Sequence, residues 1–89
     1  MTPDQLTRSA EHANLCHQAE LRRAVAAFTA TPLGDVIGVQ LVDLTCDGVA
    51  IEWVASDGAH RRQLRFQRPA TSMQDLGEQL RRELHPGIC

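Results

Sequence analysis

Histidine and cysteine side chains are the groups in this sequence best suited to hold a metal ion or a haem iron. His12 and Cys16 stand four residues apart in a segment with helical periodicity, so both side chains would project from one helix face. Two ligands make half of a zinc site, and the other candidates are scattered, without C-x-x-C or H-E-x-x-H spacing. An accidental pair on a solvated helix flank is the favoured interpretation.

A second histidine of the same segment, His17, falls within its apolar stripe. Histidines in such positions are most often buried and hydrogen-bonded, and this is the favoured interpretation. The alternative is a ligand, or a proton-responsive contact at a helix–sheet or subunit interface.

Arginine side chains gather on the third predicted strand. Strand alternation places Arg61 and Arg65 on the face opposite Leu64 and Phe66. Guanidinium groups match planar oxyanions, so this face is suited to phosphate, carboxylate or haem propionate. Glu52 on the neighbouring strand is expected to neutralise part of the charge through a cross-strand pair, which favours an ordinary solvated sheet face.

Catalytic motifs are missing from the sequence. It contains no nucleophile elbow, no Gly-rich phosphate loop and no obvious carboxylate pair. The formal net charge of −2 and the scarcity of aromatic residues argue against nucleic-acid binding. No apolar run reaches membrane-spanning length. We therefore predict a domain that is not an enzyme and that has no nucleic-acid or membrane partner.

Cysteine usage and composition indicate the cellular setting. Cys16, Cys46 and Cys89 form an odd, widely spaced set, which predicts reduced thiols in a cytoplasm, with roles that the sequence leaves open. The N-terminal residues lack the basic and apolar regions of a signal peptide. All nine basic residues are Arg, the composition expected of a GC-rich bacterial genome.

The N-terminal third of the chain predicts a helix. Thr2 can cap it, Pro3 suits its first position, and Gln5 completes a capping box. One helix over residues 3–29 accounts for the periodicity, and a break near Asn14, which could cap a second helix, is the alternative. The apolar stripe comprises Leu6, Ala10, Ala13, His17, Leu21, Ala24, Val25 and Phe28.

Three strands are predicted next, over residues 36–45, 49–54 and 60–67. Asp47-Gly48 offers the positive φ that a hairpin needs, and Ser56-Asp57-Gly58 forms a second short turn. Short turns join antiparallel neighbours, so the sheet is expected to be a meander.

A last helix follows Pro69, capped by Thr71 or Ser72 and ended by His85-Pro86-Gly87. Its apolar stripe comprises Met73, Leu76, Leu80 and Leu84. The whole chain, residues 1–89, is expected to form a single α+β domain, because its length gives one thin core. The predicted architecture is a two-layer sandwich, with both the N-terminal and the C-terminal helix on one face of a three-stranded antiparallel meander.

The chain also resembles a known family. Ala10-Glu11-His12-Ala13-Asn14-Leu15 is similar to the Ala-Asp-His-Ala-Asp pattern that opens the domain of unknown function 2470. Residues 39–51, with Asp47-Gly48, resemble its central hairpin, and Arg65-Phe66-Gln67-Arg68-Pro69 followed by Asp75-Leu76 resembles its closing segment. Members of this family lie C-terminal to the split barrel of haem-utilisation and other pyridoxamine-phosphate-oxidase-like proteins.

The resemblance implies a free-standing copy of a domain that is usually attached to a split barrel. Haem binding or haem degradation, with the barrel supplied by another chain, would then be the function class. The family pattern points to His12, and His85 lies near the place where a histidine beyond the domain ligates haem in some relatives. Glu11 replaces the usual Asp, and Asn14-Leu15-Cys16 departs from the end of the motif.

Two hypotheses follow. The first is a haem-associated accessory or binding domain, with His12, His17 or His85 as axial ligand and Arg61 or Arg65 as propionate partner. The second is an interaction module without a small-molecule ligand, which docks a split-barrel protein or a second copy of itself through a sheet edge or an apolar helix face.

Overall fold

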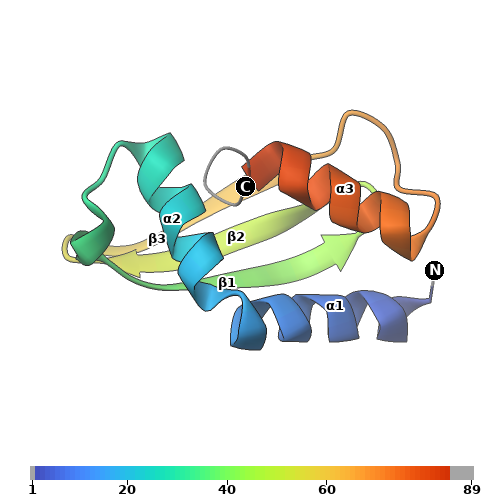
Figure 1. The fold of residues 1–89 in the computed structure, drawn as a ribbon, viewed down its shortest axis with the longest axis horizontal. Coiled ribbons are helices and arrows are strands. Elements are labelled where there is room, and N and C mark those ends of the chain that lie inside the picture. The colour runs from blue at the N-terminus through green and yellow to red at the C-terminus, as the bar shows by residue number, and fades with distance from the viewer. Residues whose placement is uncertain (1, 85–89) are drawn as a thin grey trace.

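The structure, a computed structural model, describes residues 2–84 and consists of helices packed on one face of a sheet (Figure 1). Its elements are α1 (Pro3–Cys16), α2 (Gln18–Thr29), the short 3-10 helix η1 (Leu33–Asp35), β1 (Val36–Thr45), β2 (Gly48–Ala55), β3 (Gly58–Arg65) and α3 (Met73–Leu84). The sheet is antiparallel with strand order β1-β2-β3. The predicted α+β sandwich with a meander is therefore confirmed.

The N-terminal helical segment differs from the prediction. The single helix over residues 3–29 is wrong, because the chain breaks at His17, whose backbone φ of −118° and ψ of 26° are not helical. Figure 1 shows α1 alongside β1 and α2 crossing the sheet in a new direction. The break lies close to the predicted alternative, but Asn14 does not cap α2. None of the helices formed by residues 2–84 is long and apolar enough to cross a membrane.

The strand positions follow the prediction closely. The bounds predicted for β1 are confirmed, and β2 is one residue longer at each end than residues 49–54. β3 spans Gly58–Arg65 rather than residues 60–67, and it begins early because Gly58 pairs directly with Ala55 across the turn. A positive φ occurs at Gly58 (127°), not at Gly48. Gly48 is needed for another reason, because a Cβ at this position would collide with the Leu64 carbonyl oxygen.

Two bulges in β1 decide which of its side chains face the helices. The register with β2 shifts between Val36 and Gly38 and again between Val42 and Thr45, where Asp43 adopts a φ of 51°. A bulge reverses the facing of the residues beyond it. Strict alternation is lost, and Ile37 is left exposed to solvent.

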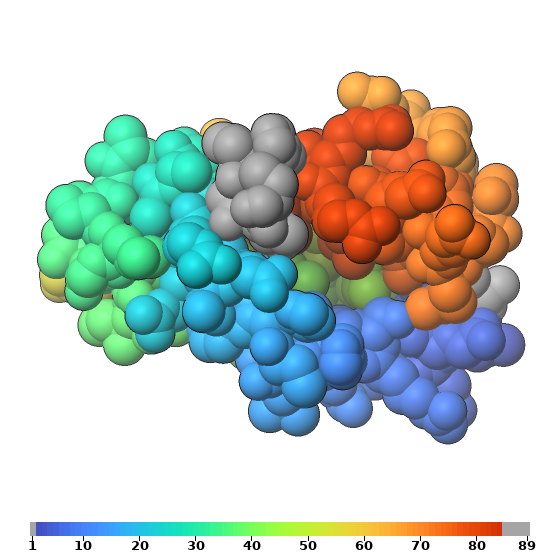
Figure 2. Space-filling model, in the orientation of Figure 1, coloured from blue at the N-terminus to red at the C-terminus, as the bar shows by residue number. Residues whose placement is uncertain are grey.

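The core lies between the sheet and the helices. Figure 2 shows α1, α2 and α3 covering most of the sheet on this side, with strand atoms visible between them. Leu21, Val25, Leu76 and Leu84 of the helices are almost fully buried, and they share one hydrophobic cluster with Ile51 of the central strand. Most of the predicted stripes reach this core. Its buried members are Ala10, Leu21, Ala24, Val25, Val36, Val39, Leu41, Leu44, Val49, Ile51, Phe66, Ala70, Leu76 and Leu84.

The loop between β3 and α3 is held by one carboxylate. Asp75 accepts hydrogen bonds from both guanidinium nitrogens of Arg68, at 2.6 and 2.9 Å, and from the Thr71 backbone N–H at 2.9 Å. Ser72 caps the helix, because its hydroxyl oxygen accepts from the Asp75 N–H. The Arg68 guanidinium, with the Thr71 N–H, lowers the pKa of Asp75 from 3.8 to about 2.

This pKa predicts how folding stability depends on pH. A carboxyl group with a lowered folded-state pKa stabilises the fold above its unfolded-state pKa and loses this contribution as pH falls through the folded-state value. We expect the parent protein to lose thermal stability between about pH 4 and pH 2, and Asp75→Asn to be less stable than the parent at pH 7 with a flatter profile below pH 4. Thermal melts followed by circular dichroism at a series of pH values test this. Glu11→Gln, an exposed change on α1, is the control and should keep the parent's profile.

Candidate binding surface

The two faces of the sheet have different surroundings. Trp53 packs edge-on against Phe28 of α2, with ring centroids 6.2 Å apart, and stacks on His60 at 5.4 Å. These residues therefore lie on the helix-covered face. Alternation then places Glu52 and Arg61 on the opposite face, which we call the open face. No helix of the described residues covers the open face (Figure 1).

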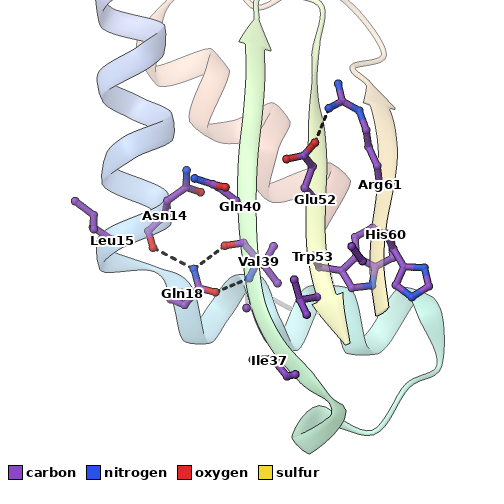
Figure 3. Close-up of a pocket in the computed structure, with 13 residues that line it drawn as sticks. Asn14, Leu15, Gln18, Ile37, Val39, Gln40, Glu52, Trp53, His60 and Arg61 are labelled. Carbon is purple, nitrogen blue, oxygen red and sulfur yellow. Dashed lines mark hydrogen bonds and ion pairs between the residues drawn. The ribbon is translucent and has the colours of Figure 1, made fainter. Parts of the chain in front are cut away.

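Amide side chains from the α1–α2 junction pair with the outer edge of β1. Gln18 Nε2 donates to the Val39 carbonyl oxygen at 2.7 Å, and the Val39 N–H donates to Gln18 Oε1 at 2.6 Å (Figure 3). Asn14 does the same at Leu41, donating from Nδ2 at 3.1 Å and accepting at Oδ1 at 2.7 Å. The two amides thus satisfy backbone groups of an edge strand as a neighbouring strand would.

This junction borders a hollow of about 810 Å³ that lies on the open face. Its lining is mostly apolar and includes Leu15, Ile37 and Val54, whose exposed fractions are 83%, 63% and 47%. The described residues contain one further large exposed apolar side chain, Leu33, which is not part of the lining. Three of four such side chains therefore gather at one place, which is uncommon for scattered surface residues.

Charged side chains at the margin of the hollow are paired with one another. Arg61 donates to Glu52 Oε2 at 2.6 Å (Figure 3) and to Asp43 Oδ2 at 2.9 Å. The hydrogen bond to Asp43, followed in size of effect by the one to Glu52, raises the pKa of the Arg61 guanidinium. The expected neutralisation by Glu52 is present, and Asp43 adds a second carboxylate that sequence alternation did not indicate, because the bulge positions it.

Two of the candidate axial ligands, His12 and His17, lie away from the hollow. His12 is exposed on α1, and its ring centroid lies 5.1 Å from that of His17. His17 is hydrogen-bonded as expected, through Nδ1 to Glu20 Oε1 at 3.1 Å, but its side chain is 43% exposed, so the expected burial is wrong. The helix break turns His17 out of the stripe. His85 and Cys89 lie outside the described residues.

The remaining candidates are not brought together either. Arg65 is exposed toward the far end of β3 and does not line the hollow, whereas Arg61 does. Cys16 is exposed and Cys46 is partly buried, and both are free thiols. No three His, Cys, Asp or Glu side chains within residues 2–84 are placed to hold a metal ion.

Sequence reasoning missed the residues that build this surface. Leu15 carried a signal, since it is an apolar residue outside the helical stripe. Asn14 and Gln18 also carried a signal in the sequence, because they are amide side chains four residues apart beside that stripe. Ile37 and Val54 carried no such signal, because their exposure depends on a bulge and on a sheet face that no helix of the described residues covers.

Comparison with known proteins identifies no relative of this chain. No family model matches the sequence, and no curated protein matches it. The resemblance to the domain of unknown function 2470 therefore stays a prediction.

The amide pairing with β1 can be tested through stability. Gln18→Ala removes both hydrogen bonds to Val39, and we expect a loss of about 1–3 kcal/mol, because each such bond contributes roughly 0.5–1.5 kcal/mol. For a domain of this size, each kcal/mol lowers Tm by about 4–8 °C. Gln74→Ala, at an exposed position of α3, is the matched control and should change Tm little. Equal Tm values for the two variants would contradict the structural role of Gln18.

Proposed function

We propose that this protein is a non-catalytic interaction module whose open face docks a second copy of the chain. The observation that carries the proposal is the gathering of Leu15, Ile37 and Val54 around one hollow. Exposed apolar side chains that cluster, and that are bordered by polar groups, mark association surfaces.

The shape of the surface favours a copy of itself as partner. Leu15, with 83% of its surface exposed, projects at the margin of a concave region. A two-fold symmetric interface uses the same patch on both partners, so one patch must supply both the projection and the recess. This surface has both, and a chain with one thin core gains stability from burying them.

The charges on the surface also suit self-association. The cation of Arg61 already contacts two carboxylates, so two copies would not meet with strongly like-charged centres. Such an arrangement, with apolar residues at the centre and paired charges at the margin, is that of ordinary protein interfaces.

Sedimentation equilibrium over a range of protein concentrations tests this proposal. We expect the parent to approach the mass of a dimer as concentration rises. The double variant Leu15→Gln, Val54→Thr should weaken dimerisation by about 10-fold or more, because truncating the centre of an interface typically costs more than 1 kcal/mol. Both positions are exposed, so circular dichroism should show an unchanged fold.

The matched control is Leu33→Gln, which alters an exposed leucine outside the hollow and should leave dimerisation unchanged. A parent that stays monomeric at every concentration would overturn self-association. The split-barrel protein implied by the family resemblance would then be the partner to seek by pull-down.

Haem binding is the second candidate function. The resemblance implies it, and the hollow favours it, being mostly apolar, within the size range of small-molecule sites and bordered by Arg61. The fit is partial. His12 and His17 do not line the hollow, and Arg61 is already held by carboxylates. His60 is among the lining residues, but its ring stacks on Trp53 at the helix-covered face, and its Nε2 pairs with Asp57 at 2.7 Å, which lowers the pKa of that carboxyl.

A titration with haem, followed by its Soret absorbance, distinguishes the two candidates. Haem binding predicts a saturable one-to-one spectral change that is lost in one of the single His→Ala variants at positions 12, 17, 60 and 85. A spectrum equal to the sum of free haem and protein would exclude this function and leave the interaction module.

A further inference from the structure

The two edges of the sheet differ in whether their outward backbone groups are hydrogen-bonded. The edge of β1 is covered by Asn14 and Gln18, as described above. Just beyond the paired strands β2 and β3, the Phe66 N–H donates to the Asp47 carbonyl oxygen at 2.9 Å. This bond continues the series of hydrogen-bonded residue pairs that begins with Gly58 and Ala55 at the turn. Bonded positions alternate along an antiparallel strand. The even-numbered residues of β3 therefore bond to β2.

The odd-numbered residues of β3 direct their backbone groups away from β2. These are Ala59, Arg61, Gln63 and Arg65. Within residues 2–84, no side chain or loop hydrogen-bonds to these backbone groups. β3 is eight residues long, pairs with β2 without a register shift, and exposes every residue except the partly buried Leu64. Such an edge can accept another strand.

The charges on β3 determine which kind of strand can pair with its free edge. The strand contains His60, Arg61, Arg62 and Arg65, and it has no acidic residue. Antiparallel pairing of two β3 strands would bring arginines of both copies together, which is unfavourable. Arg62 lies over the Phe28 ring at 5.1 Å, and neither it nor Arg65 pairs with a carboxylate of the described residues. The edge therefore repels a second copy and has cationic groups to offer to a partner.

We propose that the free edge of β3 is a peptide-binding site, which takes up an extended acidic segment of a partner protein as a fourth strand. Backbone groups of Ala59, Arg61, Gln63 and Arg65 would supply the pairing, and Arg62 and Arg65 would select acidic side chains on the two faces. Ala59 and Arg61 also line the hollow, but the edge site uses their backbone groups and not the apolar side chains proposed for dimerisation, so it does not depend on that proposal.

Hydrogen exchange provides the first test. In the free protein, we expect the amides of Arg61, Gln63 and Arg65 to exchange rapidly and those of His60 and Arg62 to be protected. The probe is a fluorescein-labelled nine-residue peptide that repeats Glu-Glu-Val, so that Glu side chains lie on both faces of the added strand. Its addition should protect the odd-numbered amides and produce a saturable rise in anisotropy. Unchanged exchange of these amides at saturating peptide would overturn the proposal, as would protection that depends on protein concentration without peptide.

Variants separate backbone pairing from charge. Gln63→Pro removes an outward N–H and leaves the bonds to β2, so it should weaken peptide binding by about 10-fold or more. Gln63→Ala keeps the N–H and should bind as the parent does. Arg65→Gln should weaken binding of the acidic peptide by several-fold and leave binding of the neutral peptide that repeats Gln-Gln-Val unchanged.

A second probe keeps the test decisive where Gln63→Pro does not fold. The same acidic peptide with proline at two alternate positions retains most of its charge but loses strand donors, and we expect it to bind the parent at least about 10-fold more weakly. Equal affinity for the two acidic peptides would show charge attraction without strand addition and would overturn the proposal.

Discussion

The pairing of Asn14 and Gln18 with the edge of β1 is the constraint on which the rest of the structure depends. A side-chain amide carries both a donor and an acceptor, so each can satisfy the N–H and the C=O of one strand residue. Gln18 directly follows the break at His17 and stays beside the last turn of α1, where its Nε2 also donates to the Asn14 carbonyl oxygen at 3.1 Å. The two strand residues that the amides contact are about 6.8 Å apart. Residues 14 and 18 therefore reach Leu41 and Val39 together, which fixes α1 antiparallel to β1 and covers an edge that would otherwise be open to aggregation.

The same pairing explains the position of the binding surface. Leu15 lies between the two amides in sequence, and with them it borders the hollow at the sheet edge. The chain leaves helical geometry at His17, directly before Gln18, so α2 can cross the sheet while Gln18 remains at the strand. Burial of Leu21 and Val25 in α2 then holds the junction from the other side. Stability and the exposed patch thus share one structural cause.

Local signals were sufficient to predict the elements, and long-range contacts account for what was missed. The capping box at Thr2, the turns at Asp47-Gly48 and Ser56-Asp57, and the alternation in β2 and β3 are written in neighbouring residues, and these features were located to within about two residues. The break at His17 depends on contacts with strand residues more than 20 positions away, which periodicity does not report. The bulges of β1 likewise displaced Ile37 and Asp43 from the faces that alternation predicts. The hollow could not be anticipated, because it combines a helix junction, a bulge and a sheet face that none of the helices within residues 2–84 covers.

The charges make the two exposed surfaces suited to different partners. On the open face, Arg61 is compensated by Asp43 and Glu52, so apolar contact rather than net charge decides what binds there, and a second copy is tolerated. Along the β3 edge, Arg62 and Arg65 have no carboxylate partner within residues 2–84 and lie beside backbone groups that no described residue pairs with, an arrangement that would repel a second copy and attract an acidic strand. Arg61 belongs to both surfaces, since its side chain borders the hollow and its backbone lies on the free edge. A strand added at the β3 edge would therefore extend the open face beside Arg61, and the two surfaces could be occupied at once without competing for the same groups.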